Sequence, residues 1–83
     1  MSKRVEVLLF ASLAERAATD RVAVDVEEDD TASDLLARIG ESWPSLAGGL
    51  ASVRVAVDHR FRAADEPLLP GEEFALIPPV SGG

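Results

Sequence analysis

The chain ends in Gly82 and Gly83, and these two residues are the first candidates for chemistry. They follow the run Ile77-Pro78-Pro79-Val80-Ser81, in which the end of an apolar strand leads into a stiff, extended proline segment. Glycine carries no side chain and therefore fits a narrow tunnel. Six extended residues from Pro78 span about 20 Å, so the carboxylate of Gly83 can reach the active site of another protein. We interpret Gly83 as the reactive group and residues 78–82 as the segment that inserts.

A carboxylate on Gly83 is a poor acyl donor until it acquires a leaving group, for example as an acyl-adenylate. The sequence contains no cysteine, which leaves no thiolate nucleophile, no disulfide and no cysteine-based metal site. Sulfur could then be held covalently only by replacing a terminal oxygen of Gly83, which gives a thiocarboxylate. The pattern favours a carrier whose terminal carboxylate is activated by another protein.

A docking surface is expected on the body of the protein. A flexible end that becomes ordered in a partner loses roughly 1–2 kcal/mol of backbone entropy per residue, and contacts elsewhere must offset this loss. In the strand predicted over residues 4–10, Leu8 and Phe10 point away from the expected core, and Ile77 does the same in the last strand. Phe61 can join them. The alternative for each of these residues is cover by the chain's own loops.

Patterns of apolar residues predict the elements that position this surface. A short helical turn is expected over residues 12–18. A longer helix is expected to begin after Thr31, whose hydroxyl can cap it, and to end near Ser42, before Pro44. A turn is expected at residues 68–71. Strands are expected over residues 4–10, 21–26, 53–57 and 74–77.

This order of elements predicts an α+β fold. Specifically, it predicts a β-grasp (ubiquitin-like) roll, in which one main helix covers a mixed sheet and the last strand lies beside the first. We expect residues 1–83 to form a single domain of this kind, with a flexible C-terminal tail over residues 78–83. The expected core contains seven apolar residues: Val5, Val7, Leu9, Leu35, Ile39, Phe74 and Leu76.

The charge of the chain limits its partners. The 15 acidic residues against 8 basic ones give a formal net charge of -7, which repels nucleic acids and anionic lipids but attracts a basic protein surface. No apolar run approaches the ~20 residues of a membrane span, so we expect a cytoplasmic protein with no membrane partner. The acidic run at residues 27–30 is interpreted as a solvated loop, and His59 as an exposed turn residue, so no metal site is expected.

Two groups of residues resemble the small subunit of molybdopterin synthase, a ubiquitin-like sulfur carrier. One group is Leu8-Leu9-Phe10-Ala11, and the other runs from Leu68-Leu69-Pro70-Gly71-Glu72-Glu73-Phe74 to Pro78-Pro79-Val80-Ser81-Gly82-Gly83. The resemblance covers nearly the whole chain. The Pro-Pro-Val-Ser-Gly-Gly ending is its most specific part, because Gly-Gly alone is shared by ubiquitin-like proteins in general.

The resemblance implies a function in molybdenum cofactor biosynthesis. It implies that an E1-like enzyme uses ATP to adenylate Gly83, that a sulfur source converts the adenylate to a thiocarboxylate, and that sulfur passes to a pterin precursor. The large synthase subunit would supply the catalytic side chains, in a heterotetramer of two small and two large subunits, and would bind Phe10, Phe61 and Ile77. The chain itself would bind no cofactor.

Three alternatives stay open. Sulfur carriers for thiazole, cysteine or tRNA thiolation would use the same chemistry at Gly83, although the Pro-Pro-Val segment argues against them. A ubiquitin-like protein modifier would attach Gly83 to lysines, although Lys3 is the only lysine for building chains. A plain β-grasp interaction module would use the apolar face alone. The sequence assigns no role to Asp58, to His59 beyond its exposure, or to the nearby arginines.

Overall fold

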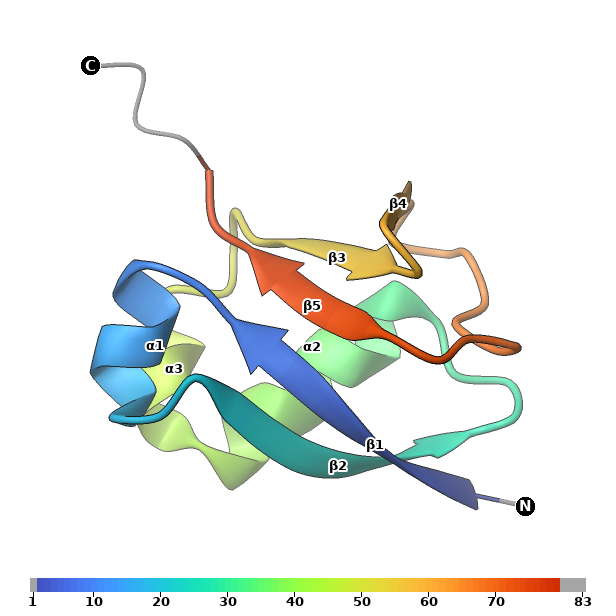
Figure 1. The fold of residues 1–83 in the computed structure, drawn as a ribbon, viewed down its shortest axis with the longest axis horizontal. Helices are drawn as coiled ribbons and strands as arrows, with labels where there is room; N and C mark the ends of the chain where they lie inside the picture. Colours follow the sequence, from blue (N-terminus) through green and yellow to red (C-terminus); the bar gives the residue numbers. More distant parts are fainter. Residues whose placement is uncertain (1, 80–83) are drawn as a thin grey trace.

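The described residues form a five-stranded mixed sheet and three helices (Figure 1). It is a computed structural model, and it describes residues 2–79. Its elements, in chain order, are β1 (Ser2–Leu9), α1 (Ser12–Ala17), β2 (Arg21–Glu27), α2 (Ala32–Ser42), α3 (Pro44–Ala47), β3 (Arg54–Val57), β4 (Arg60–Arg62) and β5 (Phe74–Ile77).

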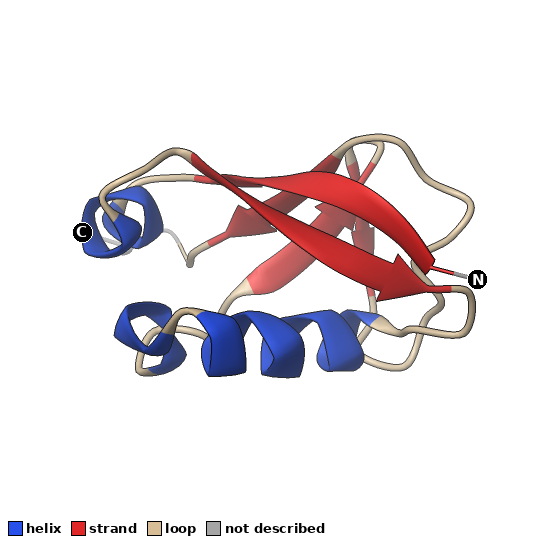
Figure 2. Ribbon diagram, turned by 90° about the horizontal axis from the view of Figure 1, so that it is seen from below, coloured by secondary structure: helices blue, strands red, loops and turns tan. Residues whose placement is uncertain are grey.

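The order of the strands across the sheet is β2-β1-β5-β3-β4. β1 and β2 form an antiparallel hairpin, whereas β5 lies between β1 and β3, parallel to β1 and antiparallel to β3. Seen from the edge of the sheet, α2 and α3 lie along one of its faces (Figure 2). The predicted α+β class and β-grasp arrangement, with the last strand beside the first, are confirmed.

α2 begins where the sequence indicates, because Thr31 and Asp34 cap it reciprocally. Oγ1 of Thr31 accepts a hydrogen bond from the Asp34 backbone N–H at 3.3 Å, and Oδ2 of Asp34 accepts one from the Thr31 backbone N–H at 2.9 Å. The helix ends at Ser42. Both predicted ends of this helix are therefore confirmed.

α3 is a helix that the sequence prediction missed. Pro44 stops α2, but it also begins α3, because the first turn of a helix does not use the N–H that proline lacks. None of the helices within residues 2–79 has the length and the apolar character that a membrane span requires.

β1 differs in its bounds from the expected strand, and β4 is a strand that the sequence prediction missed. β1 begins at Ser2 and ends at Leu9, so Phe10 follows the strand instead of belonging to it. β4 has three residues, too few for an alternating pattern to identify. It forms because the chain reverses tightly at Asp58 and His59 and pairs with β3.

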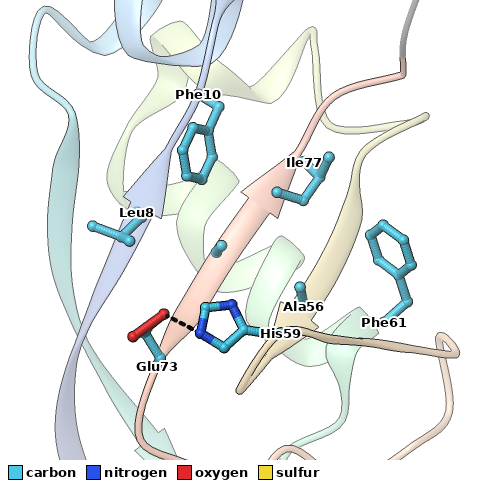
Figure 3. Close-up of a pocket in the computed structure, with 8 residues that line it drawn as sticks. Leu8, Phe10, Ala56, His59, Phe61, Glu73 and Ile77 are labelled. Carbon is cyan, nitrogen blue, oxygen red and sulfur yellow. Dashed lines mark ion pairs between the residues drawn. The ribbon is translucent and has the colours of Figure 1, made fainter.

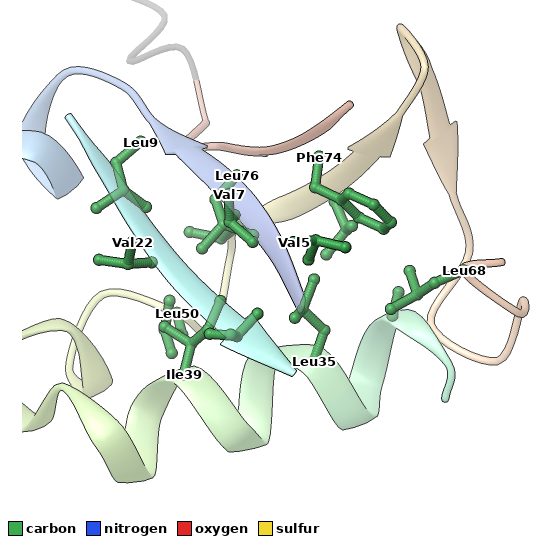
Figure 4. Close-up of a cluster of buried hydrophobic side chains, with 14 of the residues drawn as sticks. Val5, Val7, Leu9, Val22, Leu35, Ile39, Leu50, Leu68, Phe74 and Leu76 are labelled. Carbon is green, nitrogen blue, oxygen red and sulfur yellow. The ribbon is translucent and has the colours of Figure 1, made fainter. Parts of the chain in front are cut away.

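The core lies between the sheet and α2, and the inner faces of β1 and β5 supply much of its sheet side (Figure 4). All seven residues of the predicted core are at most 5% exposed. Burial of each large apolar side chain stabilises the fold by about 1.5–3 kcal/mol. Several further residues complete the core, among them Leu13, Val22, Val24, Val26, Leu46, Leu50, Val53, Val55, Val57 and Leu68.

Close packing requires glycine at position 71, where the chain approaches β5. A Cβ atom there would lie 2.4 Å from Cγ1 of Val57 and 3.0 Å from the carbonyl oxygen of Leu68. The carbonyl oxygen of Gly71 also accepts a hydrogen bond from Nζ of Lys3 at 3.0 Å. The segment before β5 is thus held against both β1 and β3.

Asp30 is buried, so the expectation of a solvated loop over residues 27–30 is wrong at this position. Asp30 is 8% exposed. Its Oδ2 accepts a hydrogen bond from the Glu27 backbone N–H at 2.7 Å, and both carboxylate oxygens accept hydrogen bonds from the Arg38 guanidinium on α2. The hydrogen bonds from Arg38 lower the pKa of the Asp30 carboxyl and outweigh burial, which acts in the opposite direction. The loop is therefore tied to the helix that follows it.

We predict that Asp30→Asn lowers the free energy of unfolding at neutral pH by roughly 1–3 kcal/mol, because Arg38 loses its charged acceptor. The folded-state pKa of Asp30 lies below its unfolded value of about 4. Its contribution is therefore present above the unfolded pKa and is lost as the pH falls through the folded pKa. Urea titrations should show a difference between wild type and variant that shrinks in acid.

Asp29→Asn is the matched control for this measurement, because it removes the same charge from an exposed neighbour. It should change the stability by less than about 0.5 kcal/mol. Equal losses from the two variants would show that the Asp30 contacts do not stabilise the fold.

Candidate docking groove

The face of the sheet opposite the helices carries an apolar groove (Figure 3). Among residues 2–79, Phe10 and Phe61 are the large apolar side chains that are exposed, at 46% and 51%. Eight residues line this outer groove: Leu8, Phe10, Ala56, His59, Phe61, Glu73, Ala75 and Ile77.

Cross-strand pairing explains the shape of the outer groove. Ala75 on β5 pairs with Leu8 on β1 to one side and with Ala56 on β3 to the other, and Ala56 pairs in turn with Phe61 on β4. The two alanines leave a low floor, whereas Leu8 and Phe61 rise at its sides. Small residues on adjacent strands, flanked by large ones, thus make a concave apolar surface.

The structure brings the three predicted partner-binding residues together. Phe10 follows β1, Phe61 lies on β4 and Ile77 ends β5, and all three line the outer groove. The chain passes from Ile77 into Pro78, which is half-buried, and Pro79, which is exposed. The other residues predicted for the site lie outside the described residues: Val80, Ser81, Gly82 and Gly83.

The end of the outer groove away from Pro78 is polar. Nε2 of His59 lies 3.0 Å from Oε1 of Glu73, and both side chains are exposed (Figure 3). The exposure predicted for His59 is confirmed. Among the residues that the structure describes, no group of three or more His, Cys, Asp or Glu side chains is placed to hold a metal ion. The rest of the outer groove has an apolar lining, which suits it to docking an apolar surface.

Asp58 has a structural role that the sequence left open. Asp58 and His59 form the two-residue connection between β3 and β4, and both have positive φ, 51° and 68°, as in the hairpin turns whose twist matches paired strands. Oδ1 of Asp58 accepts hydrogen bonds from the backbone N–H groups of Glu73 and Glu72, at 2.9 and 3.1 Å. These hydrogen bonds, led by that from Glu73, lower the pKa of the Asp58 carboxyl. Asp58 thus links the β3–β4 turn to the start of β5.

Arg54 lies at the opposite end of the outer groove from this turn. It pairs in register with Ile77, and its Cζ lies 4.2 Å from the centroid of the Phe61 ring, within the range of a cation–π contact. Such a contact at an exposed site stabilises by about 0.5–1 kcal/mol. It orients the Phe61 ring at the side of the groove.

The sequence prediction missed Arg54, Ala56, Glu73 and Ala75 as residues of this site, because only strand register brings them together. The two-residue spacing of Arg54 and Ala56, and of Glu73, Ala75 and Ile77, is a usable signal. It identifies a common face only once β3 and β5 are known to be neighbours.

Comparison with known proteins identifies the family. The model of the ThiS family matches residues 7–83. The chain belongs to the ThiS family. This ThiS-family chain is 30% identical to the molybdopterin synthase sulfur carrier subunit of Dictyostelium discoideum, with 100% of both chains covered. That similarity confirms the resemblance found in the sequence.

A second relative of this ThiS-family chain is named as a protein modifier and not as a sulfur carrier. The chain is 36% identical to small archaeal modifier protein 1 of Haloferax volcanii, with 95% of this chain and 100% of that protein covered. The crystal structure of the Haloferax protein matches the fold with a TM-score of 0.82, at 35% identity, over 98% of this chain and 100% of that chain.

We predict that Asp58→Ala lowers the melting temperature of this ThiS-family chain, because alanine removes the acceptor of two N–H groups and disfavours a positive φ. Asp58→Asn keeps a side-chain oxygen and tolerates a positive φ, so its loss should be smaller. Because the pKa of Asp58 is lowered in the folded state, its contribution should fade as the pH drops through that pKa. Thermal melts at neutral and acidic pH measure both effects, and identical melting temperatures for the two variants at neutral pH would contradict this role.

Proposed function

We propose that the chain is the sulfur carrier subunit of a molybdopterin synthase. In this proposal an E1-like enzyme uses ATP to adenylate the carboxylate of Gly83, and a sulfur donor displaces AMP to leave a thiocarboxylate. The sulfur then passes to a pterin precursor of the molybdenum cofactor. The large synthase subunit binds the outer groove and accepts residues 78–83. Because the activation consumes ATP, we place the carrier in the cytoplasm.

The observation that carries the proposal is the position of the outer groove beside the end of β5. Ile77 belongs to the groove, and Pro78 follows it directly. A partner that covers Phe10, Phe61 and Ile77 is therefore placed to receive the residues that come next. The family match through Gly83 and the full-length similarity to a molybdopterin synthase sulfur carrier subunit support the same conclusion.

The polar groups around the outer groove also fit a carrier. His59 pairs with Glu73, Asp58 holds the β3–β4 turn, and Arg54 stacks on Phe61. None of these contacts has the arrangement of a nucleophile and its base. We therefore assign the catalytic side chains to the large subunit, in a heterotetramer of two small and two large subunits.

Removal of Gly83 is expected to abolish sulfur transfer while leaving the fold and docking nearly intact. The truncated chain would end at Gly82, whose carboxylate lies about 3.5 Å short of the required position. The assay combines the chain with an E1-like enzyme, ATP, a sulfur source and the large subunit, and follows conversion of the pterin precursor. Intact mass should show one oxygen replaced by sulfur in wild type only. Ser33→Ala, an exposed position on α2 that leaves residues 78–83 unchanged, is the control, and unchanged transfer by the truncated chain would refute the proposal.

Phe10→Asp and Ile77→Asp are each expected to weaken binding to the large subunit by roughly tenfold or more, because a carboxylate enters a surface that the partner desolvates. Calorimetric titration measures the affinity. Ser33→Asp adds the same charge at an exposed position on α2, and it should bind as wild type does. If the groove variants match Ser33→Asp, the partner docks elsewhere.

Protein modification is the second candidate function, favoured by the similarity to small archaeal modifier protein 1. In that case Gly83 forms isopeptide bonds with lysines of other proteins. Mass spectrometry of the chain's partners in its native host separates the two functions. A thiocarboxylate without lysine conjugates supports the carrier, whereas Gly83–lysine linkages support the modifier.

A further inference from the structure

Arg54 is a charged residue at the outer groove to which the described chain gives no counter-ion. Its guanidinium stacks on Phe61, with Cζ 4.2 Å from the ring centroid, and its backbone pairs with Ile77. Arg54 is exposed. It therefore occupies the end of the groove where the chain passes from β5 into Pro78.

The other arginines on this face of the sheet are neutralised by neighbours. Nε of Arg4 on β1 lies 3.3 Å from Oδ1 of Asp25, and Nη1 of Arg21 on β2 lies 3.3 Å from Oε1 of Glu6. Within residues 2–79, Arg54 makes no ion pair; its contact is with an aromatic ring. The face thus presents one arginine whose charge is still available to a partner.

The unpaired charge of Arg54 opposes binding when a partner covers the outer groove. A partner that packs on Phe61 and Ile77 also removes water from the guanidinium that lies over the Phe61 ring, and desolvation of an unpaired charge opposes binding. The cost is offset only if the partner supplies an anion at the same place. The overall charge of -7 draws in a basic surface, so a carboxylate at this point would be a specific feature of the correct partner.

We propose that Arg54 is a specificity-determining residue of the outer groove, and that the partner places an Asp or Glu carboxylate against its guanidinium. The inference rests on the proposed function, in which that partner is the large synthase subunit. It adds a charged recognition contact to the apolar one.

Stacking on Phe61 suits Arg54 to this contact. The ring restricts the side chain before the partner arrives, so less conformational entropy is lost when the ion pair forms. A guanidinium that lies over a ring still presents N–H groups at its edges, which match the two oxygens of a carboxylate. A lysine at this position would supply the charge without the planar fork.

The test is the affinity of the full chain for the large synthase subunit of the same organism, measured at low and high salt. Arg54→Met keeps an unbranched side chain over Phe61 but removes the charge. We expect it to bind roughly tenfold or more weakly at low salt, with an affinity that depends less on salt than that of wild type. Arg54→Lys should fall between the two.

Arg16→Met is the matched control. Arg16 is an exposed arginine of α1 that lies against Gly48 and Gly49 and makes no ion pair among residues 2–79. Its replacement removes the same charge outside the outer groove, so binding should match wild type. Circular dichroism of all variants checks that each is folded.

Two results would overturn the role of Arg54 while leaving the proposed function intact. One is equal affinity of wild type and Arg54→Met. The other is a loss with unchanged salt dependence, since Arg54 would then act only by supporting the Phe61 ring. A folded wild-type chain that does not bind the large subunit would instead contradict the proposed function, and this inference with it.

Discussion

The parallel pairing of β5 with β1 is the constraint on which the rest of the structure depends, because it joins opposite ends of the sequence in the middle of the sheet. Val7 pairs with Phe74 and Leu9 with Leu76, while the other edge of β5 pairs with β3. The β1–β2 and β3–β4 hairpins become one sheet only through this strand. Contacts so distant in sequence incur loop-closure entropy, which burial of Phe74 and Leu76 helps to offset.

The same strand gives the sheet two different faces. Phe74 and Leu76 point into the core, whereas Ala75 and Ile77 point into the outer groove. A shift of register by one residue would exchange these sets, so that an alanine and an isoleucine would replace a phenylalanine and a leucine in the core. The stability of the core therefore fixes the composition of the docking groove, and also the point from which residues 78–83 depart.

Polar contacts secure the segments that connect these strands. Asp30 ties the loop after β2 to α2 through Arg38, and Asp58 ties the β3–β4 turn to the start of β5. Both are carboxylates whose pKa is lowered by hydrogen bonding. Asp58 thus fixes one end of the outer groove, whereas Asp30 fixes the helix that covers the opposite face of the sheet.

The sequence by itself determined what depends on neighbouring residues. Alternating apolar residues located the main strands and the inward-facing core, and Thr31 and Pro44 marked the two ends of α2. The Pro-Pro-Val-Ser-Gly-Gly ending indicated Gly83 as the reactive group. Each of these signals is local. Tertiary structure alone decided the rest. Strand pairing brings Arg54 to Phe61 and Ala56 to Ala75, and the packing of α2 brings Arg38 to Asp30. Contacts that depend on strand register and helix packing leave no local signal in the order of residues.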